Sequence, residues 1–450
     1  ISGGAGTFSL SATEITDLGN PGFSLITIGR SNGTALMTIN ADTFLDPITF
    51  RMGGASGDIT TVGALVTSNL AMTFTAGTGT GGTFTQTAGG ANTIATGSGN
   101  ITISADVIVL NTTANTITGT GTITLQPATG TTTIGIGDSA TGTFDLDANE
   151  IAALTNGFSS ITIGASGGSG AIDINAITFN DPVTIRGGAM VVTALQAGAN
   201  NITLTSDSTI DEDVDNTTVD ITTSGTLSLT AEGAIGATGG SGPLDLTVGT
   251  LVATTDAGGI FLLESSALII GGTGVQTTGA NAAIEITLTA GDLTLQDDIT
   301  ANGSGTVTLA VLGADASLIT GDTNDDIAST SGAISITADR LALVTGTISS
   351  SGALTLQPNA SGETIGLGNS ATGDFNLTAT EIGLLTDGFS SITIGKANSG
   401  AVDINALTFT DPVTIQGAAI TVTSLAAGAN NITLTSTGAI DEDANDTTVD

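Results

Sequence analysis

A long internal copy constrains this chain more than any other feature of its sequence. Residues 171–220 return as residues 401–450, with 35 of 50 positions identical and a constant offset of 230. Such self-similarity is typical of repeat proteins, in which each unit stacks on its neighbours and buries a continuous core. Residues that recur in every copy are therefore expected to serve the stack before they serve a single site.

A shorter version of the same pattern marks three homologous modules. Elements of the form GxF-x-L-x-A-x-E-I, S-x-ITIG, INA-x-TF and DP-[VI]-T follow one another in each of them. The modules lie at about residues 6–54, 142–220 and 373–450, with extra coils between them. No charge run or proline-rich stretch separates them, so we expect one continuous β-solenoid over residues 1–450.

The composition excludes several kinds of chemistry. The chain has no Cys and no His, which removes disulfides, thiolate nucleophiles and histidine-based catalysis. Five Lys and Arg face 42 Asp and Glu, giving a net charge of -37. Nucleic acid is an unsuitable partner for such a chain, whereas cations such as calcium are attracted to it. The best apolar stretch, residues 258–271, is interrupted by Glu264 and is shorter than the roughly 20 residues that span a bilayer, so we expect no membrane insertion.

Short runs of period two predict β-strands almost throughout the chain. Thr, Val and Ile alternate with small residues, and frequent Gly disfavours helix. One anchor per run gives intervals of 17 to 25 residues, whereas strands of antiparallel sandwiches lie about 8–12 residues apart. We predict an all-β fold, a parallel β-helix (β-solenoid) with about 20 residues per coil and roughly 22 coils. The anchors are Ile101, Ile123, Phe144, Ile161, Val183, Ile202, Leu227 and Leu246.

Two recurring residue types, Phe and Thr, are interpreted as parts of the β-solenoid rather than as a binding site. Nine of the 13 Phe occupy fixed positions in the modules, and we interpret them as spacers in the core. Thr-x-Thr pairs raise the alternative of an ice-binding surface. Ice matching needs equal spacing on every coil, which intervals of 17 to 25 residues do not provide, so we attribute the threonines to β-propensity. The nine phenylalanines are Phe8, Phe144 and Phe375, Phe23, Phe158 and Phe389, and Phe44, Phe179 and Phe409.

Three strand runs carry a resemblance to a known family. They are GSGNITISAD at 97–106, GTGTITLQP at 119–127 and SGAISITAD at 331–339. With them the chain resembles the repetitive shafts of large bacterial exoproteins, the filamentous haemagglutinin-like adhesins. The resemblance covers essentially the whole chain and lies in its composition and coil pattern. It implies a secreted or surface-anchored, right-handed parallel β-helix that projects from a Gram-negative cell.

An acidic segment in the second module suggests a metal site. The run IDEDVDN at 210–216 returns as IDEDAND at 440–446, and its alternate side chains offer oxygen ligands of the kind that calcium prefers. An EF-hand loop would have Gly and Glu where Asn216 and Thr222 stand. A solvated acidic corner that keeps the protein soluble is the alternative interpretation. The candidate calcium ligands are Asp211, Asp213, Asp215, Asp441, Asp443 and Asn445.

Recurring carboxylates raise the possibility of glycoside hydrolysis, which uses a pair of them. The glutamates recur in the A-x-E-I element and the aspartates recur before Pro, but an active site is normally single. The chain also has no Trp or Tyr to stack on a sugar. We therefore predict that the chain is not an enzyme and that the Asp-Pro pairs start turns. The residues are Glu14, Glu150 and Glu381, and Asp46, Asp181 and Asp411.

Together these observations predict an extracellular structural or adhesive fibre segment at the surface of a bacterium. The expected partners are further units that continue the stack, by self-association or within one polypeptide, and a cell-surface or glycan receptor. A calcium-organised surface-layer or matrix protein is the first alternative. A polysaccharide-active β-helix enzyme is the second.

Overall fold

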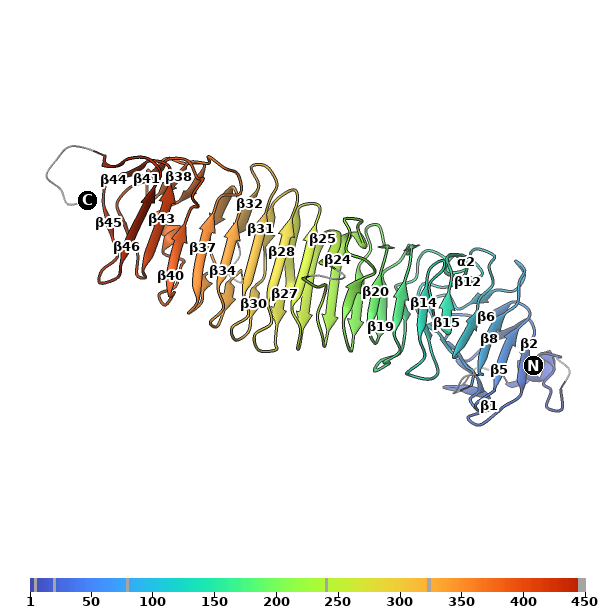
Figure 1. Ribbon diagram of the computed structural model, residues 1–450. Helices are drawn as coiled ribbons and strands as arrows, with labels where there is room; N and C mark the ends of the chain where they lie inside the picture. The colour runs from blue at the N-terminus through green and yellow to red at the C-terminus, as the bar shows by residue number, and fades with distance from the viewer. Residues whose placement is uncertain (4–5, 19–21, 78–80, 239–241, 322–324, 444–450) are drawn as a thin grey trace. The chain divides into compact units, whose positions relative to one another are not determined.

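The chain forms a parallel β-solenoid (Figure 1). The computed structural model describes residues 1–3, 6–18, 22–77, 81–238, 242–321 and 325–443. It has about 18 turns, which follow one another about 23 residues apart, and only 4% helix. The predicted parallel β-helix is confirmed, with fewer and longer turns than we expected from the sequence.

Two compact units make up the chain. The first contains Ile1–Asp213 and Asp220–Gly225, and the second contains Val214–Val219 and Thr226–Asp450. Strand β24 (Ile221–Ala231) supplies residues to both. The single continuous body over residues 1–450 stays a prediction.

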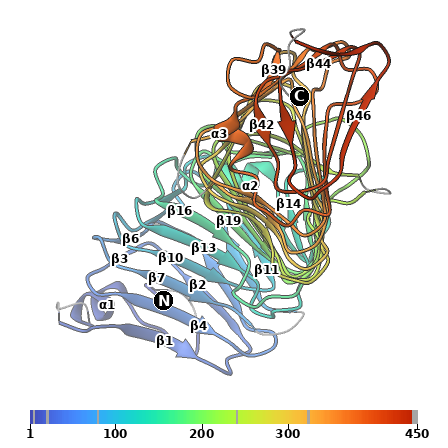
Figure 2. The same cartoon turned by 90° about the vertical axis from the view of Figure 1, so that its left-hand side faces the viewer.

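In the first unit, the coils supply strands to parallel sheets in a fixed order. Each of the first four coils has three strands, and these enter three separate sheets (Figure 2). The strands are β1 (Ile26–Arg30), β2 (Leu36–Ile39), β3 (Asp42–Phe44), β4 (Ile48–Met52), β5 (Asp58–Thr61), β6 (Leu65–Thr67), β7 (Met72–Thr75), β8 (Thr83–Gln86), β9 (Ile94–Ala95), β10 (Ile101–Ser104), β11 (Val107–Val109), β12 (Ile117–Thr118), β13 (Thr122–Gln126), β14 (Ile134–Ile136), β15 (Phe144–Leu146), β16 (Ser160–Ile163), β17 (Ile172–Ile174), β18 (Ile177–Thr178), β19 (Val183–Gly187), β20 (Met190–Val192), β21 (Leu195–Gln196), β22 (Ile202–Ser206) and β23 (Ile210–Glu212).

The second unit repeats this plan after two long strands, β25 and β27. Its strands are β25 (Leu244–Thr255), β26 (Ile260–Glu264), β27 (Leu268–Thr277), β28 (Ile284–Leu288), β29 (Leu293–Leu295), β30 (Ile299–Ala301), β31 (Val307–Val311), β32 (Ser317–Thr320), β33 (Ile327–Ser329), β34 (Ile334–Thr337), β35 (Arg340–Leu343), β36 (Ile348–Ser349), β37 (Ala353–Gln357), β38 (Ile365–Leu367), β39 (Phe375–Leu377), β40 (Ser391–Ile394), β41 (Val402–Ile404), β42 (Leu407–Thr408), β43 (Val413–Gly417), β44 (Ile420–Val422), β45 (Leu425–Ala426), β46 (Ile432–Ser436) and β47 (Ile440–Glu442).

One sheet of each unit carries a ladder of aliphatic side chains, one from each coil. Every member is buried except Ile26 and Ile432, which lie in the first and last strands of their ladders. Each buried side chain stabilises the fold by roughly 1.5–3 kcal/mol, so the core grows with each coil. The ladder of the first unit is Ile26, Ile48, Met72, Ile101, Ile123, Ile161, Val183 and Ile202. That of the second unit is Ile260, Ile284, Val307, Ile334, Leu354, Ile392, Val413 and Ile432.

Two coils are longer than the others because each contains an extra strand and a short helix. From Ile123 to Ile161, and from Leu354 to Ile392, the ladder advances by 38 residues. Phe144 was expected to anchor this ladder, but it lies on β15 and pairs with Ile134 of β14 instead. The extra segment therefore leaves the ladder and returns to it in register.

Three helices occupy the A-x-E-I elements, although the composition disfavours helix nearly everywhere. They are α1 (Ala12–Leu18), α2 (Ala148–Ala152) and α3 (Ala379–Ile382). None of the helices in the described residues is long and apolar enough to cross a membrane.

The phenylalanine prediction is correct for seven of the nine residues. Phe44, Phe144, Phe158, Phe179, Phe375, Phe389 and Phe409 are buried in the core. Phe8 and Phe23 of the first module are exposed, so their assignment as core spacers was wrong for this structure. The reason is that their counterparts are covered by a coil that lies before them in the stack, and the described residues contain no such coil before the first module.

Threonines form a regular row on the outer face of the same sheet in the first unit. The variable coil length does not disturb this row, because strands pair in register whatever the length of the loops between them. Our premise that unequal intervals break such rows was wrong. The row two residues further along each strand contains five different residue types, so threonines line up in one row only and do not form a flat array. That row is Gly29, Arg51, Thr75, Ser104 and Gln126. The threonine row is Thr27, Thr49, Thr73, Thr102, Thr124, Thr162, Thr184 and Thr203.

Candidate functional site

The recurring glutamates hold the short helices in place. Asp147 caps α2 and accepts a hydrogen bond from the Glu150 N–H, at 2.8 Å, while the Glu150 side chain accepts one from the Asp147 N–H. Thr378 and Glu381 form the same reciprocal pair at α3. This capping box satisfies backbone donors that the first turn of a helix leaves free.

The same glutamates also tie each helix to the coil that precedes it in the stack. Oε1 of Glu150 accepts a hydrogen bond from the N–H of Leu110, at 2.8 Å, and Oε1 of Glu381 accepts one from Leu343, at 3.2 Å. Burial raises the pKa of Glu150 in spite of these hydrogen bonds. Both oxygens of these carboxyl groups accept hydrogen bonds from backbone N–H groups, an arrangement that favours a structural role over glycoside chemistry.

The aspartates that precede Pro are buried and join successive coils. Asp181 accepts a hydrogen bond from the N–H of Gly157, at 2.8 Å, and Asp411 accepts one from Gly388, at 3.0 Å. Both glycines have a positive φ, of 126° and 131°, which L-residues rarely adopt. Each aspartate therefore links the glycine at which the chain reverses after the helix to the residues that begin the next coil.

A groove of about 350 Å³ lies beside α2 in the first unit. Asn156, Asn180 and Gln196 line it with exposed amide groups, next to the buried Asp181. The third module has Asp387, Thr410 and Ala426 at the three amide positions. The amides are thus particular to the second module, and sequence analysis did not select them.

The residues of the acidic segment in the second module differ in their exposure to solvent. In β23, Ile210 and Glu212 are buried and Asp211 is partly exposed, as alternation along a strand requires. Asp213 is exposed, and so is Asp215, which belongs to the second unit. In the copy, Asp441 and Asp443 are exposed, and Asn445 lies outside the described residues. In the described part of the chain these predicted ligands do not gather into one acidic cluster, and the calcium hypothesis stays a prediction.

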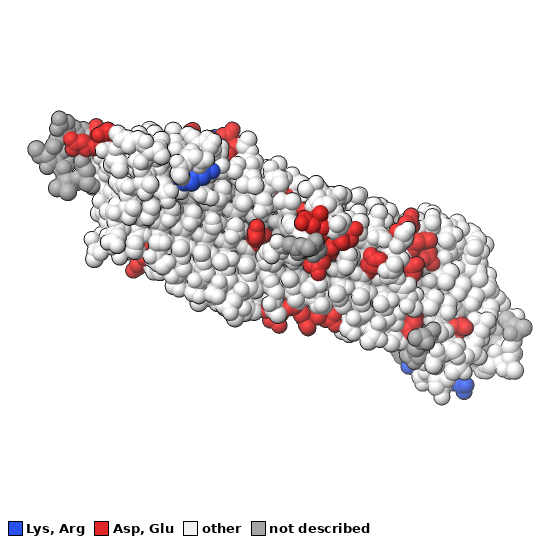
Figure 3. Space-filling model, in the orientation of Figure 1, with Lys and Arg blue, Asp and Glu red and all other residues white. Residues whose placement is uncertain are grey.

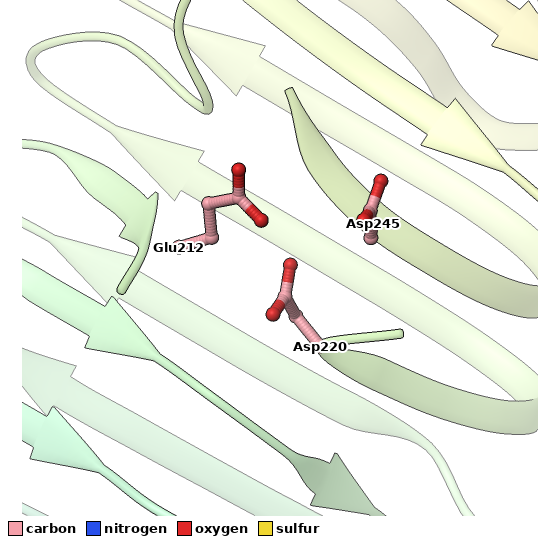
Figure 4. A group of neighbouring side chains, drawn as sticks. All are labelled: Glu212, Asp220 and Asp245. Carbon is pink, nitrogen blue, oxygen red and sulfur yellow. The ribbon is translucent and has the colours of Figure 1, made fainter. Parts of the chain in front are cut away.

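The structure brings together two acidic residues that sequence analysis passed over. Glu212 and Asp220 of the first unit are both buried, and their carboxylate oxygens lie within 4.8 Å of each other (Figure 4). Two carboxylates at this distance repel each other unless a proton or a cation lies with them. A shared proton satisfies the pair as well as a cation does, so the pair alone does not favour calcium. The alternation Ile210, Glu212 was the signal that could have identified the inward carboxylate.

Asp245 of the second unit, also drawn in Figure 4, is a third buried acidic residue. Removal from water, together with the negative charge of Asp215, raises its pKa to about 6 from an ordinary value of 3.8. This carboxyl group therefore titrates in a range where most aspartates are fully ionised.

The surface charge is dispersed over the face that Figure 3 shows, where acidic residues form several separate groups on a mainly uncharged surface. No protein-family model matches the chain, and neither a curated protein nor a solved structure matches it.

Proposed function

We propose that the chain is a non-enzymatic structural segment of an extracellular bacterial fibre or adhesin. The observation that carries the proposal is the use of the recurring carboxylates. Glu150 and Glu381 join backbone donors of neighbouring coils, and Asp181 and Asp411 fix the reversals between coils. The residues that the modules repeat thus serve the cohesion of the stack. The resemblance to haemagglutinin-like shafts supports the same role.

Labelling of intact cells tests the location that this proposal requires. Antibodies against the chain are applied to intact and to permeabilised cells of the organism that encodes it, with a cytoplasmic protein as the control. Label on intact cells is the expected result. Label that needs permeabilisation, like the control, would contradict an extracellular role.

The groove beside α2 supports a glycan receptor as a partner, because amide groups donate and accept hydrogen bonds with sugar hydroxyls. A glycan array probed with the chain should give ligands whose binding is lost in Asn180→Ala together with Gln196→Ala. The matched control is Thr410→Ala, at the Asn180 position of the third module, which should bind like the wild type. Turnover of a bound glycan would support the enzyme alternative instead.

The calcium alternative has its own measurement. If calcium organises the acidic segments, its removal by a chelator lowers the melting temperature and its return restores it, whereas magnesium at the same concentration does not. Asp211→Asn with Asp213→Asn, and Asp441→Asn with Asp443→Asn, should each reduce the calcium response. Equal melting temperatures with calcium and with chelator would remove this alternative.

A further inference from the structure

A buried carboxylate lines the groove beside α2. Asp181 is 5% exposed, and its Oδ1 accepts the hydrogen bond from the Gly157 N–H. Its Oδ2 accepts no hydrogen bond from any residue that the structure describes. A carboxylate oxygen in a largely buried place is costly without a donor, so Oδ2 takes its donor from whatever occupies the groove.

The equivalent aspartates of the other two modules are closed off from solvent at this atom. Oδ1 of Asp46 and of Asp411 each accepts a hydrogen bond from a glycine N–H, at 3.2 and 3.0 Å, as Oδ1 of Asp181 does. The Oδ2 atoms of Asp46 and Asp411 are completely buried and have no hydrogen-bond partner among the described residues. Oδ2 of Asp181 is not sealed in this way, because the groove reaches this residue. The second module therefore shares the structural use of Oδ1 and differs in leaving Oδ2 accessible.

Three amide groups stand around the accessible carboxylate. Asn156 follows α2 in the turn before Gly157, and Asn180 directly precedes Asp181. Gln196 lies on β21, which pairs with β18 just before Asn180. None of the three amides has a hydrogen-bond partner in the part of the chain that the structure describes. All three are exposed, so they can donate to a ligand and accept from it.

The exposed amides and the accessible oxygen occur together in one module. Structural residues recur in all three modules, as the aspartates themselves do, whereas these amides do not recur. Their coincidence with an open carboxylate therefore favours a binding role over a structural one. At the positions of Asn180 and Gln196, the first module has Leu45 and Val66, and the third has Thr410 and Ala426.

The size and walls of the groove suit a small ligand. Its volume of about 350 Å³ falls in the range of small-molecule sites, roughly 300–1,000 Å³. Ile151, Leu154 and Ile177 line it together with the polar groups. Apolar walls with a few placed polar groups are typical of such sites.

Charge excludes acidic ligands from the groove. The residues that line it are all described by the structure, and none of them is Lys or Arg. Asp181 would repel a carboxylate, sulfate or phosphate group, and so would the net charge of -37.

A positively charged donor satisfies the same site. Hydrogen bonds between a cation and a carboxylate are stronger than neutral ones, and the negative field of the chain concentrates cations. A ligand also displaces water from Oδ2 and has to supply a donor in its place. Among the groups that sugars carry, a free amine is the one that is positively charged at neutral pH.

We propose that the groove beside α2 binds a hexosamine with a free amino group, as a part of a larger glycan. The ammonium group donates to Oδ2 of Asp181, and Asn156, Asn180 and Gln196 bind the ring hydroxyls. This inference rests on the proposed receptor function of the groove and names the class of its ligand.

Acetylation of the ligand tests the charge without any change to the protein. Isothermal titration calorimetry is performed with tetramers of glucosamine and of galactosamine, and with their N-acetylated forms. At least one free-amine tetramer should bind about tenfold more tightly than its acetylated form, because acetylation removes the positive charge. Failure of both free-amine tetramers to bind, or equal binding of the acetylated forms, would overturn the proposal.

Two matched variants test the role of Asp181. Asp181→Asn and Asp411→Asn each remove one negative charge, and each retains an oxygen that can accept the glycine N–H. General attraction of a cationic ligand therefore falls equally in both. Asp181→Asn should weaken binding of the free-amine tetramer by about tenfold, and Asp411→Asn should bind like the wild type. Equal affinities of the two variants would show that Oδ2 of Asp181 is not the acceptor.

A third variant keeps the test independent of the buried aspartate. Asn180→Ala together with Gln196→Ala alters exposed side chains only, so it should fold, as circular dichroism checks. Its affinity for the free-amine tetramer should fall by about tenfold, because two hydrogen-bonding groups are lost. An unchanged affinity would contradict the placement of the sugar in this groove.

A lysine tetrapeptide separates a sugar from a protein partner. It carries amino groups of similar charge but no ring hydroxyls, and it should bind about tenfold more weakly than the free-amine tetramer. Equal binding would overturn the sugar assignment in favour of a basic peptide. Neutral glycans that need Asn180 and Gln196, without any preference for an amine, would overturn this inference and leave the receptor function standing. Cell labelling is independent of all these results.

Discussion

Asp245 shows how burial of a single residue makes the stability of the second unit depend on pH. Its pKa is raised to about 6 in the fold and is near 3.8 when the chain is unfolded. The folded state therefore holds this proton more tightly, and stability falls as the pH rises from about 4 through about 6. Asp245→Asn removes the charge and should raise the melting temperature by several degrees at pH 7.5, with the gain lost below about pH 4.

The control for Asp245 is Asp387→Asn, which removes an exposed carboxylate of the same unit. Its melting temperature should follow that of the wild type at every pH. A lower melting temperature for Asp245→Asn across the whole pH range would show that other contacts of this side chain outweigh its desolvation.

The inward carboxylates were the residues that sequence reasoning missed. It selected Asp211, Asp213 and Asp215 for their even spacing, but side chains of a strand alternate between faces, and the strand begins with the buried Ile210. Alternation therefore points Glu212 inward. Asp220 lies eight residues further along, and only the three-dimensional path of the chain shows that it meets Glu212.

At the scale of elements, the short helices depend on the preceding coil through one carboxylate. Glu150→Ala removes the capping box and leaves the N–H of the buried Leu110 without its acceptor. We expect a loss of about 2–3 kcal/mol in the free energy of unfolding, measured with urea. Amide hydrogen exchange at Leu110 should accelerate as well.

Glu14→Ala is the matched control in the first module, where the same glutamate contacts only its own helix cap in the described residues. Its effect on stability should be clearly smaller than that of Glu150→Ala. Equal losses would show that the contact between coils contributes little.

These helices were predictable from the sequence, although composition argued against them. Ser11, Asp147 and Thr378 each stand three residues before a glutamate, which is the sequence pattern of a capping box. The high content of Thr, Val, Ile and Gly hid this local signal. Strand positions were easier to predict, because the same alternation recurs in nearly every coil.

At the scale of the whole molecule, each coil should be removable as a unit. Deletion of residues 284–306 joins Ala283 to Val307 and lets Val307 take the place of Ile284 beside Ile260. Because a coil contacts mainly its neighbours, the variant should fold with a melting temperature within a few degrees of the wild type. Circular dichroism and thermal unfolding measure this outcome.

Deletion of residues 284–305, one residue fewer, is the control for this prediction. It places Thr306 in the aliphatic ladder and reverses the faces of the strand that follows. This variant should be much less stable or insoluble. Similar behaviour of the two deletions would mean that the ladder does not determine the register.

Architecture was the most predictable level, because the spacing of the strand runs is incompatible with hairpins. The number of turns was less predictable. Phe144 has the residue type and the spacing of a ladder anchor, and only the fold shows that its strand leaves the ladder. The 38-residue coil from Ile123 to Ile161 was therefore counted as two.

The matching coil lengths in the two copies also bear on the gene. From Ile123 and from Leu354, the ladder advances by 38 residues and then by nearly equal steps to Ile202 and to Ile432. Unequal recombination between the two copies would add or remove 230 codons, keep the reading frame and leave each ladder in register. Closely related strains should therefore encode proteins whose lengths differ by multiples of this block.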